Sequence, residues 1–232
     1  MSFAANLAAI QTRIAAACAR CGRDPATVRL LAVSKTVAVP GVAEAVAAGQ
    51  QLFGENYVQE FVAKAAQLPP TLEWHFIGAL QSNKVKYLAG KVALIHSVDR
   101  LTLAREIDRQ WGKLGLCADI LLEVNLGDEG SKAGSGAAEV LALATAVARL
   151  PHLRLRGLMA LPPFLDDPAA VRPYFRRLRE LALELSRALP GIELPELSMG
   201  MSHDFEVAIE EGATLIRVGT ALFGARPPKP PG

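Results

Sequence analysis

Lys35 ends an apolar run in the stretch Leu30–Thr36, whose sequence is LLAVSKT. In an α/β protein such a run predicts a strand buried on both faces, and the residue at its carboxyl end points toward the place where these folds carry out chemistry. Burial away from water lowers the pKa of a lysine, so that a fraction of it is present as the free amine. The free amine attacks a carbonyl group to form a Schiff base. The alternative is a lysine whose ammonium group extends from the strand end into solvent.

Arg217 lies in the last apolar segment of the chain, Thr214–Gly219. Side chains alternate along a strand, so if Ile216 and Val218 face outer helices, Arg217 faces the interior together with Leu215 and Gly219. A buried guanidinium needs a hydrogen-bond acceptor or an anion. Either an ion pair with Glu123 or a bound ligand would supply one, and the sequence leaves both open.

Two turns near the C-terminus have the character of anion sites. The stretch Ser198–Ser202 places a flexible turn before a helix expected to begin at Ser202, and Gly219 and Thr220 follow the last strand. Helix N-termini and exposed amides bind phosphate, and (β/α)8 barrels hold phosphate in the loops after strands seven and eight. A phosphate site, an arginine and a lysine that seeks an aldehyde together describe a site for pyridoxal 5'-phosphate (PLP).

The elements that would position these residues alternate between strand and helix. A helix over 3–21 comes first, with a stop at Gly22, and helix caps are expected at Asp99 and Asp167. Even spacing and the lack of G-x-G-x-x-G after the first strand favour an α/β fold that is a single (β/α)8 TIM barrel over a doubly wound open sheet. Strands are expected within 30–36 and over 51–54, 72–77, 92–97, 118–125, 153–161, 194–199 and 214–219. The whole chain, 1–232, is assigned to this one barrel domain, with a proline-rich tail at 226–232.

In such a barrel the strand ends converge, so residues distant in the sequence can meet at one site. The residues expected there are Lys35, Asn56, His75, Asn125, Ser202 and Arg217. His75 faces either this site or the core as a hydrogen-bonded histidine. The other three histidines are spaced too irregularly to suggest a metal cluster.

Composition excludes several classes of protein. A net charge of +2 over 232 residues gives no case for nucleic acid or an anionic membrane as the main partner. We find no signal peptide and no apolar run long enough to span a bilayer. The three cysteines, Cys18, Cys21 and Cys117, suit a reducing compartment, so the cytoplasm is expected. The C-x-x-C spacing of the first two lies inside a helical pattern and is interpreted as coincidence.

With these residues in view, the chain resembles the PLP homeostasis protein family, also called the YggS or PROSC family, which has the fold of the alanine racemase barrel domain. The matching stretches are AVSKT at 32–36, FGENYVQE at 53–60, WHFIGALQSNK at 74–84, LRGLMALP at 155–162, LSMGMSHDFEVAIEEG at 197–212 and IRVGTALFGAR at 216–226. Two positions depart from the family pattern: Ala79 replaces a usual proline, and His203 stands where an acidic or small residue is common.

The resemblance implies a role for each candidate residue. It implies that Lys35 forms an aldimine with PLP and that Arg217 faces the pyridine nitrogen. It further implies that the phosphate is held by Ser202, Gly219 and Thr220, and that Asn56 lies beside the cofactor. A positive charge at the pyridine nitrogen disfavours its protonation and weakens PLP as an electron sink.

Three functions follow as hypotheses. The first is a non-catalytic PLP carrier, expected to be monomeric, that supplies PLP to apo-enzymes and takes part in vitamin B6 homeostasis. The second is a weak amino-acid racemase with Lys35 as one base and His75 or a water as the other. The third is an aldolase-type barrel in which Lys35 attacks a sugar phosphate without a cofactor. Tyr57, Tyr87 and Tyr174 fall in helical patterns, so no tyrosine offers itself as a second base.

Overall fold

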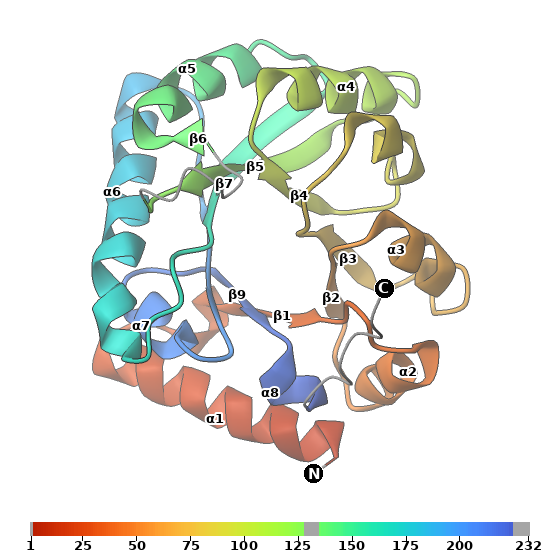
Figure 1. The fold of residues 1–232 in the computed structure, drawn as a ribbon, viewed down its shortest axis with the longest axis vertical. Helices are drawn as coiled ribbons and strands as arrows, with labels where there is room; N and C mark the ends of the chain where they lie inside the picture. Colours follow the sequence, from red (N-terminus) through yellow and green to blue (C-terminus); the bar gives the residue numbers. More distant parts are fainter. Residues whose placement is uncertain (1, 128–134, 225–232) are drawn as a thin grey trace.

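The computed structural model describes residues 2–127 and 135–224, so the expected tail at 226–232 lies outside the described residues. Within these residues, eight parallel strands form a closed barrel surrounded by helices (Figure 1). They are β1 (Arg29–Val33), β2 (Leu52–Glu55), β3 (Glu73–Phe76), β4 (Leu94–Val98), β5 (Ala118–Asn125), β7 (Leu153–Ala160), β8 (Glu196–Met201) and β9 (Leu215–Val218). The strand order is β4-β3-β2-β1-β9-β8-β7-β5, and pairing of β4 with β5 closes the ring. The predicted (β/α)8 barrel is confirmed.

Helices follow the strands on the outside of the ring. They are α1 (Phe3–Arg20), α2 (Val39–Ala47), α3 (Val58–Ala65), α4 (Leu101–Gly112), α5 (Ala137–Val147), α6 (Arg172–Ala188), α7 (Phe205–Glu210) and α8 (Thr220–Phe223). Shorter 3-10 turns are η1 (Pro25–Thr27), η2 (Ser82–Tyr87) and η3 (Pro168–Val171), and a two-residue strand, β6 (Ser135–Gly136), pairs with β5. No helix within 2–127 or 135–224 combines the length and apolar character that crossing a bilayer requires.

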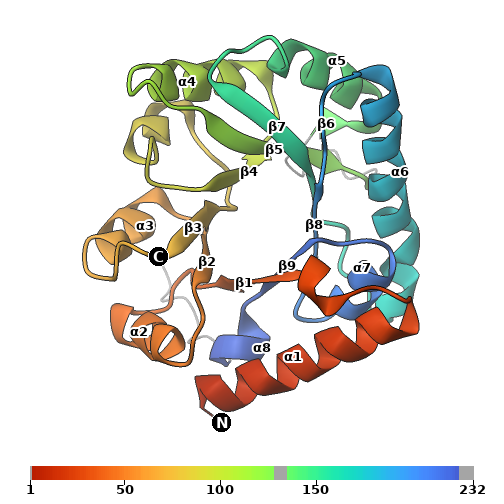
Figure 2. The same ribbon diagram turned by 180° about the vertical axis from the view of Figure 1, so that it is seen from behind.

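The extra N-terminal helix, α1, lies along the outside of the barrel beside α7 and α8, as the views from both sides show (Figures 1 and 2). Its buried residues repeat at helical spacing and include Phe3, Leu7, Ile10 and Ile14. This apolar stripe gives α1 its one buried face.

The barrel interior is a separate layer from the core under the helices. Leu94, Leu121, Met159 and Leu215 pack together inside, whereas Ile216 and Val218 belong to the larger core between strands and helices. The alternation expected along the last strand is therefore confirmed. It turns Arg217, between Ile216 and Val218, into the interior.

Two expected helix caps are wrong. The residue before α4 is Arg100, with no side-chain cap bond, and Asp99 accepts a hydrogen bond from its guanidinium at 2.6 Å. The residue before α7 is Asp204, not Ser202, because the Asp204 carboxylate accepts from the Met201 N–H at 2.6 Å and extends the turn. Asp167 caps as expected, accepting from the Ala169 N–H, although the first turn it caps is η3.

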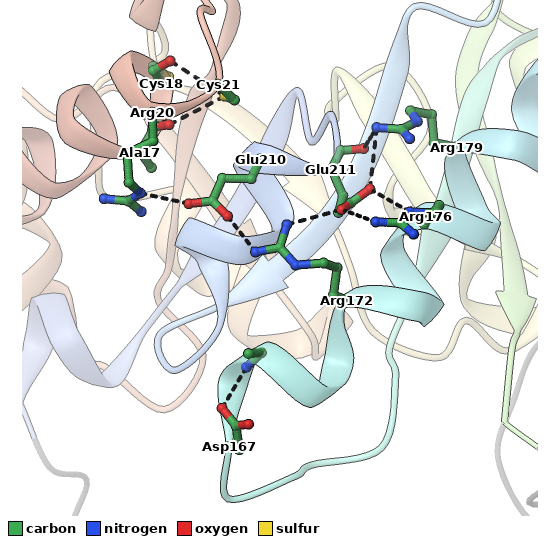
Figure 3. Close-up of polar contacts among 11 residues, drawn as sticks. Ala17, Cys18, Arg20, Cys21, Asp167, Arg172, Arg176, Arg179, Glu210 and Glu211 are labelled. Atoms are coloured by element: carbon green, nitrogen blue, oxygen red, sulfur yellow. Dashed lines mark hydrogen bonds and ion pairs between the residues drawn. The ribbon is translucent and has the colours of Figure 1, made fainter.

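An ion-pair network joins α1, α7 and α6 on the outside of the barrel (Figure 3). Glu210 pairs with Arg20 of α1 and with Arg172 of α6. Glu211, whose side chain is only 5% exposed, pairs with three arginines of α6: Arg172 at 3.0 Å, Arg176 at 3.1 Å and Arg179 at 3.4 Å. Because the arginines share carboxylates, this network is a better candidate for a measurable contribution to stability than isolated surface pairs are.

The cysteines of the C-x-x-C spacing lie at the C-terminal end of α1. All three cysteines are free thiols in the described structure, and the Cys21 thiol donates to carbonyl oxygens of α1. Among the described residues no group of histidine, cysteine and acidic side chains could hold a metal ion.

Candidate functional site

A cavity of about 370 Å³ opens at the carboxyl ends of the strands, and six residues expected at the site line it together. These are Lys35, Asn56, Ser202, Arg217, Gly219 and Thr220. The remaining wall includes Val33, Ile77, Leu161, Phe164, Met201 and His203. Of the six residues expected to converge at the strand ends, four line this cavity, while His75 and Asn125 are not among the lining residues.

The backbone around Lys35 is held on both sides. The Ser34 hydroxyl donates to Glu55 at 2.6 Å, and the Thr36 N–H donates to Glu60 at 2.7 Å. Thr36 has a φ of 62°, a left-handed conformation that is uncommon and strained for a residue other than glycine. Its hydrogen bond to Glu60 helps to keep this conformation and hence the direction in which Lys35 leaves the strand.

A buried ion pair lies directly behind Lys35. The Lys64 ammonium group donates to Glu55 and to the Ser34 carbonyl, both at 2.6 Å, and to Glu60 at 3.1 Å. Burial raises the pKa of Glu55, and hydrogen bonds from Lys64 and Ser34 oppose this rise. We missed this pair in the sequence. Its signal was the spacing of Val58, Phe61 and Lys64, which puts a lysine on the buried face of α3.

Arg217 is 4% exposed and reaches the cavity from the barrel interior. Its guanidinium donates to the Ser198 hydroxyl at 2.6 Å and to the Ala160 carbonyl at 2.8 Å. No carboxylate in the described part of the chain lies within ion-pair distance, so the expected alternative of a direct pair with Glu123 is wrong. Burial lowers the pKa of Arg217 to about 10, against the attraction of Asp204 and Glu123, so it stays a cation at neutral pH.

Ser202 connects the turns after β8 and β9. Its hydroxyl accepts from the N–H groups of Gly219 and Ala221, at 3.3 and 3.4 Å, and thus serves the first turn of α8 instead of α7. Gly200, with a φ of 89°, makes this turn possible because a Cβ there would stand 2.5 Å from Ala208. Ser202, Gly219 and Thr220 are consequently neighbours at one end of the cavity.

Asn56 has an unsatisfied polar atom. Its side-chain oxygen is buried and has no hydrogen-bond partner among residues 2–127 and 135–224, which is uncommon for a buried polar group. Gly78 packs so closely that a Cβ there would stand 2.3 Å from the Asn56 carbonyl oxygen, which fixes the backbone of Asn56. An oxygen held in place beside a cavity without a partner fits a ligand that donates a hydrogen bond.

His75 is a core histidine, one of the two alternatives that the sequence left open. Its Nδ1 lies 2.9 Å from Nε2 of His96, and the Nδ1 of His96 lies 2.9 Å from the Ser198 hydroxyl that receives Arg217. Sequence reasoning missed His96 and Ser198. The available signal was strand alternation, since Leu94 and His96 share the interior face of β4.

The rim of the cavity carries Phe164 and His203. Phe164 is 71% exposed, and its ring lies 5.0 Å from the His203 ring, centroid to centroid. His203 Nε2 lies within hydrogen-bond distance of the Leu165 and Asp166 carbonyl oxygens. The departure at His203 thus gives this chain an aromatic contact at the rim.

Comparison with known proteins places the chain in a family. The model of the alanine racemase N-terminal domain matches residues 5–227. The pyridoxal phosphate homeostasis protein of Aquifex aeolicus is 50% identical over 227 residues, which cover 97% of this chain and 99% of that protein. The chain belongs to the pyridoxal phosphate homeostasis protein family. The resemblance seen in the motifs is confirmed over almost the whole length.

Solved structures agree with this family assignment. PipY of Synechococcus elongatus, in a structure with PLP bound, superimposes with a TM-score of 0.85 at 40% identity and covers 96% of this chain and 100% of its own. Alanine racemase of Streptomyces coelicolor shares the fold, with a TM-score of 0.68 at 20% identity. The match covers 95% of this chain and 59% of the racemase.

Proposed function

We propose that this chain binds PLP in the 370 Å³ cavity and serves PLP homeostasis, with Lys35 holding the aldehyde covalently. The observation that carries this function is that an amine, a guanidinium and the turns after β8 and β9 line one cavity. The names of the relatives and the PLP in the PipY structure support the choice of ligand. Bound PLP would supply an aldehyde that can be stored on the lysine and released again.

The other lining residues take the roles that their chemistry suits. Arg217 would donate to the pyridine nitrogen, and because it stays a cation at neutral pH, it would leave that nitrogen without a proton. Ser202, Gly219 and Thr220 would hold the phosphate where the two turns meet. The unsatisfied oxygen of Asn56 would accept a hydrogen bond from the ligand.

We propose further that the protein is a carrier without catalytic turnover. A racemase needs a second base on the far side of the substrate, and none of the tyrosines is among the residues that line the cavity. His75, the other candidate, is engaged on both ring nitrogens inside the barrel. We further propose that it is a monomer that hands PLP to apo-enzymes in the cytoplasm, a reducing compartment that its free thiols suit.

The first test compares three proteins after addition of PLP and removal of the excess. The wild type and Lys113→Ala, which removes an exposed lysine at the C-terminal end of α4, should both show the visible absorbance of PLP bound to an amine. Lys35→Ala should lose that band and keep its circular dichroism spectrum. A folded Lys35→Ala protein with an unchanged band would overturn the role of Lys35.

A second test separates the carrier from the racemase. The loaded protein is mixed either with an apo form of a PLP enzyme or with amino acids in deuterated water. We expect activation of the apo-enzyme and no exchange of the α-proton above that caused by free PLP. Exchange that Lys35→Ala abolishes would establish catalysis and refute the carrier proposal.

A further inference from the structure

A chain of hydrogen bonds crosses the barrel interior from the PLP cavity to the opposite face. It runs from Arg217 to Ser198 at 2.6 Å, from Ser198 to His96 at 2.9 Å, from His96 to His75 at 2.9 Å and from His75 to Glu73 at 2.9 Å. Glu73 is the first residue of β3 and lines another cavity, of about 420 Å³, at the amino ends of the strands. The chain thus connects the two ends of the barrel.

The two ends of this chain fix the direction of every hydrogen bond in it. A guanidinium can only donate, and an ionised carboxylate can only accept. The Ser198 hydroxyl accepts from Arg217 and therefore has its own hydrogen free for Nδ1 of His96. His96 then carries its hydrogen on Nε2 and donates to Nδ1 of His75, which in turn donates from Nε2 to Glu73. Both imidazoles are neutral in this arrangement and hold their hydrogen on Nε2.

The surroundings of the two rings support neutral imidazoles. His75 and His96 are both buried, and burial lowers the pKa of each ring. Glu73 and Glu196 raise the pKa of His75, Arg29 lowers it, and Arg217 lowers that of His96. Glu73 has a lowered pKa because it accepts from His75, so its carboxylate is ionised at neutral pH. The negative end of the chain is 43% exposed, and the positive end is buried.

We propose that His96 and Ser198, backed by His75 and Glu73, are positioning residues that orient Arg217 toward PLP. This role rests on the proposed function, because it assigns a purpose to the orientation of Arg217. In the described structure Arg217 has no carboxylate partner within ion-pair distance, and its NH1 is directed by a hydroxyl whose own orientation depends on the two rings. Through the same chain, the protonation state of Glu73 at the opposite end of the barrel would affect the hydrogen bond that orients Arg217.

Proton uptake would reverse the two hydrogen bonds in the middle of this chain. If the pair of rings gained one proton, His75 would donate from both nitrogens and His96 would carry its hydrogen on Nδ1. His96 would then donate to Ser198, which would no longer have an acceptor for its own hydrogen at that ring. The hydroxyl that holds Arg217 would thereby change its role, so the site should respond to acid through a group that does not line the PLP cavity.

The test begins with the apo-protein, so that it does not depend on PLP binding. Nitrogen-15 NMR of labelled histidine reports the protonation and tautomer of each ring. The variant His152→Gln/His203→Gln leaves only the signals of His75 and His96. We expect two neutral rings at pH 7.5 with hydrogen on Nε2. Glu73→Gln should shift the signals of His96, although Glu73 contacts His75 and Arg29 and not His96. A charged ring, or hydrogen on Nδ1 of either ring, would overturn the chain.

The second measurement asks whether the chain serves the PLP site. Ser198→Ala removes the acceptor of a buried guanidinium and should weaken PLP affinity about tenfold, with a changed absorbance spectrum. Ser198→Thr, which keeps the hydroxyl, should restore affinity, and His152→Gln serves as the control. Unchanged affinity and spectrum in a folded Ser198→Ala protein would refute the positioning role. A wild type that takes up no PLP would refute the proposed function instead and leave the NMR result standing.

Discussion

Glu123 should make the stability of the folded protein fall with rising pH. It is buried on β5, and burial raises its pKa from 4.5 to about 7, with Asp99 adding to the rise and Arg217 opposing it. The difference between these two pKa values, at about 1.36 kcal/mol for each pKa unit, corresponds to about 3 kcal/mol. Below pH 4.5 the carboxyl is neutral in both the folded and the unfolded state, so it has no effect there. Between 4.5 and 7 the unfolded state loses its proton first, and stability falls until the folded carboxyl has ionised as well.

The variant Glu123→Gln removes this titration and keeps a side chain of similar size. Urea unfolding at pH 4.5 and pH 8.5 should give nearly equal stabilities for variant and wild type at the lower pH. At the higher pH the variant should be more stable by about 3 kcal/mol, because the pKa of about 7 already includes the opposing attraction of Arg217. Glu193→Gln, at an exposed position, is the control. A difference between variant and wild type that does not change with pH would refute the reasoning.

Three further predictions concern the network behind Lys35, the outer ion pairs and the histidines. Lys64→Met leaves the buried Glu55 without its cation and should lower the unfolding free energy by about 3–5 kcal/mol in urea titrations. The double variant Lys64→Met/Glu55→Gln should recover part of this loss. If the single and the double variant lose the same free energy, the pairing is contradicted. Glu211→Gln should lower the unfolding free energy by about 1 kcal/mol, and less in 1 M salt, so a loss independent of salt would contradict an ionic origin. Since burial lowers the pKa of His75, its contribution to folding stability is present above pH 6.5 and is lost as the pH falls below that value. His75→Gln should therefore reduce the loss of unfolding free energy at acidic pH. The same dependence of unfolding free energy on pH in variant and wild type would contradict this.

Local pattern predicted the barrel and the main site residues because each signal depended on one strand at a time. An apolar run ending at Lys35, and alternation around Arg217, are properties of consecutive residues, and the closed barrel then brings strand ends together. The family resemblance supplied the roles that pattern could not assign, such as that of Asn56.

The features that sequence missed depend on how strands line up with one another. His75 meets His96 because β3 pairs with β4, and His96 meets Ser198 across the interior, 102 positions away in the chain. The prediction that Ser202 caps α7 is wrong, because a serine before a helical pattern has the same local signature whether it caps that helix or the next one. Asp204 is a second candidate for the residue that precedes α7, and the structure shows that Asp204 occupies this position.

The most direct measurement is borohydride reduction of the PLP-loaded protein followed by peptide mapping. Reduction converts a linkage between PLP and a lysine into a stable amine, which marks that lysine by mass. The account predicts a single pyridoxyl adduct on Lys35, and none in Lys35→Ala. An adduct on another lysine in the wild type, or no adduct after loading, would contradict it.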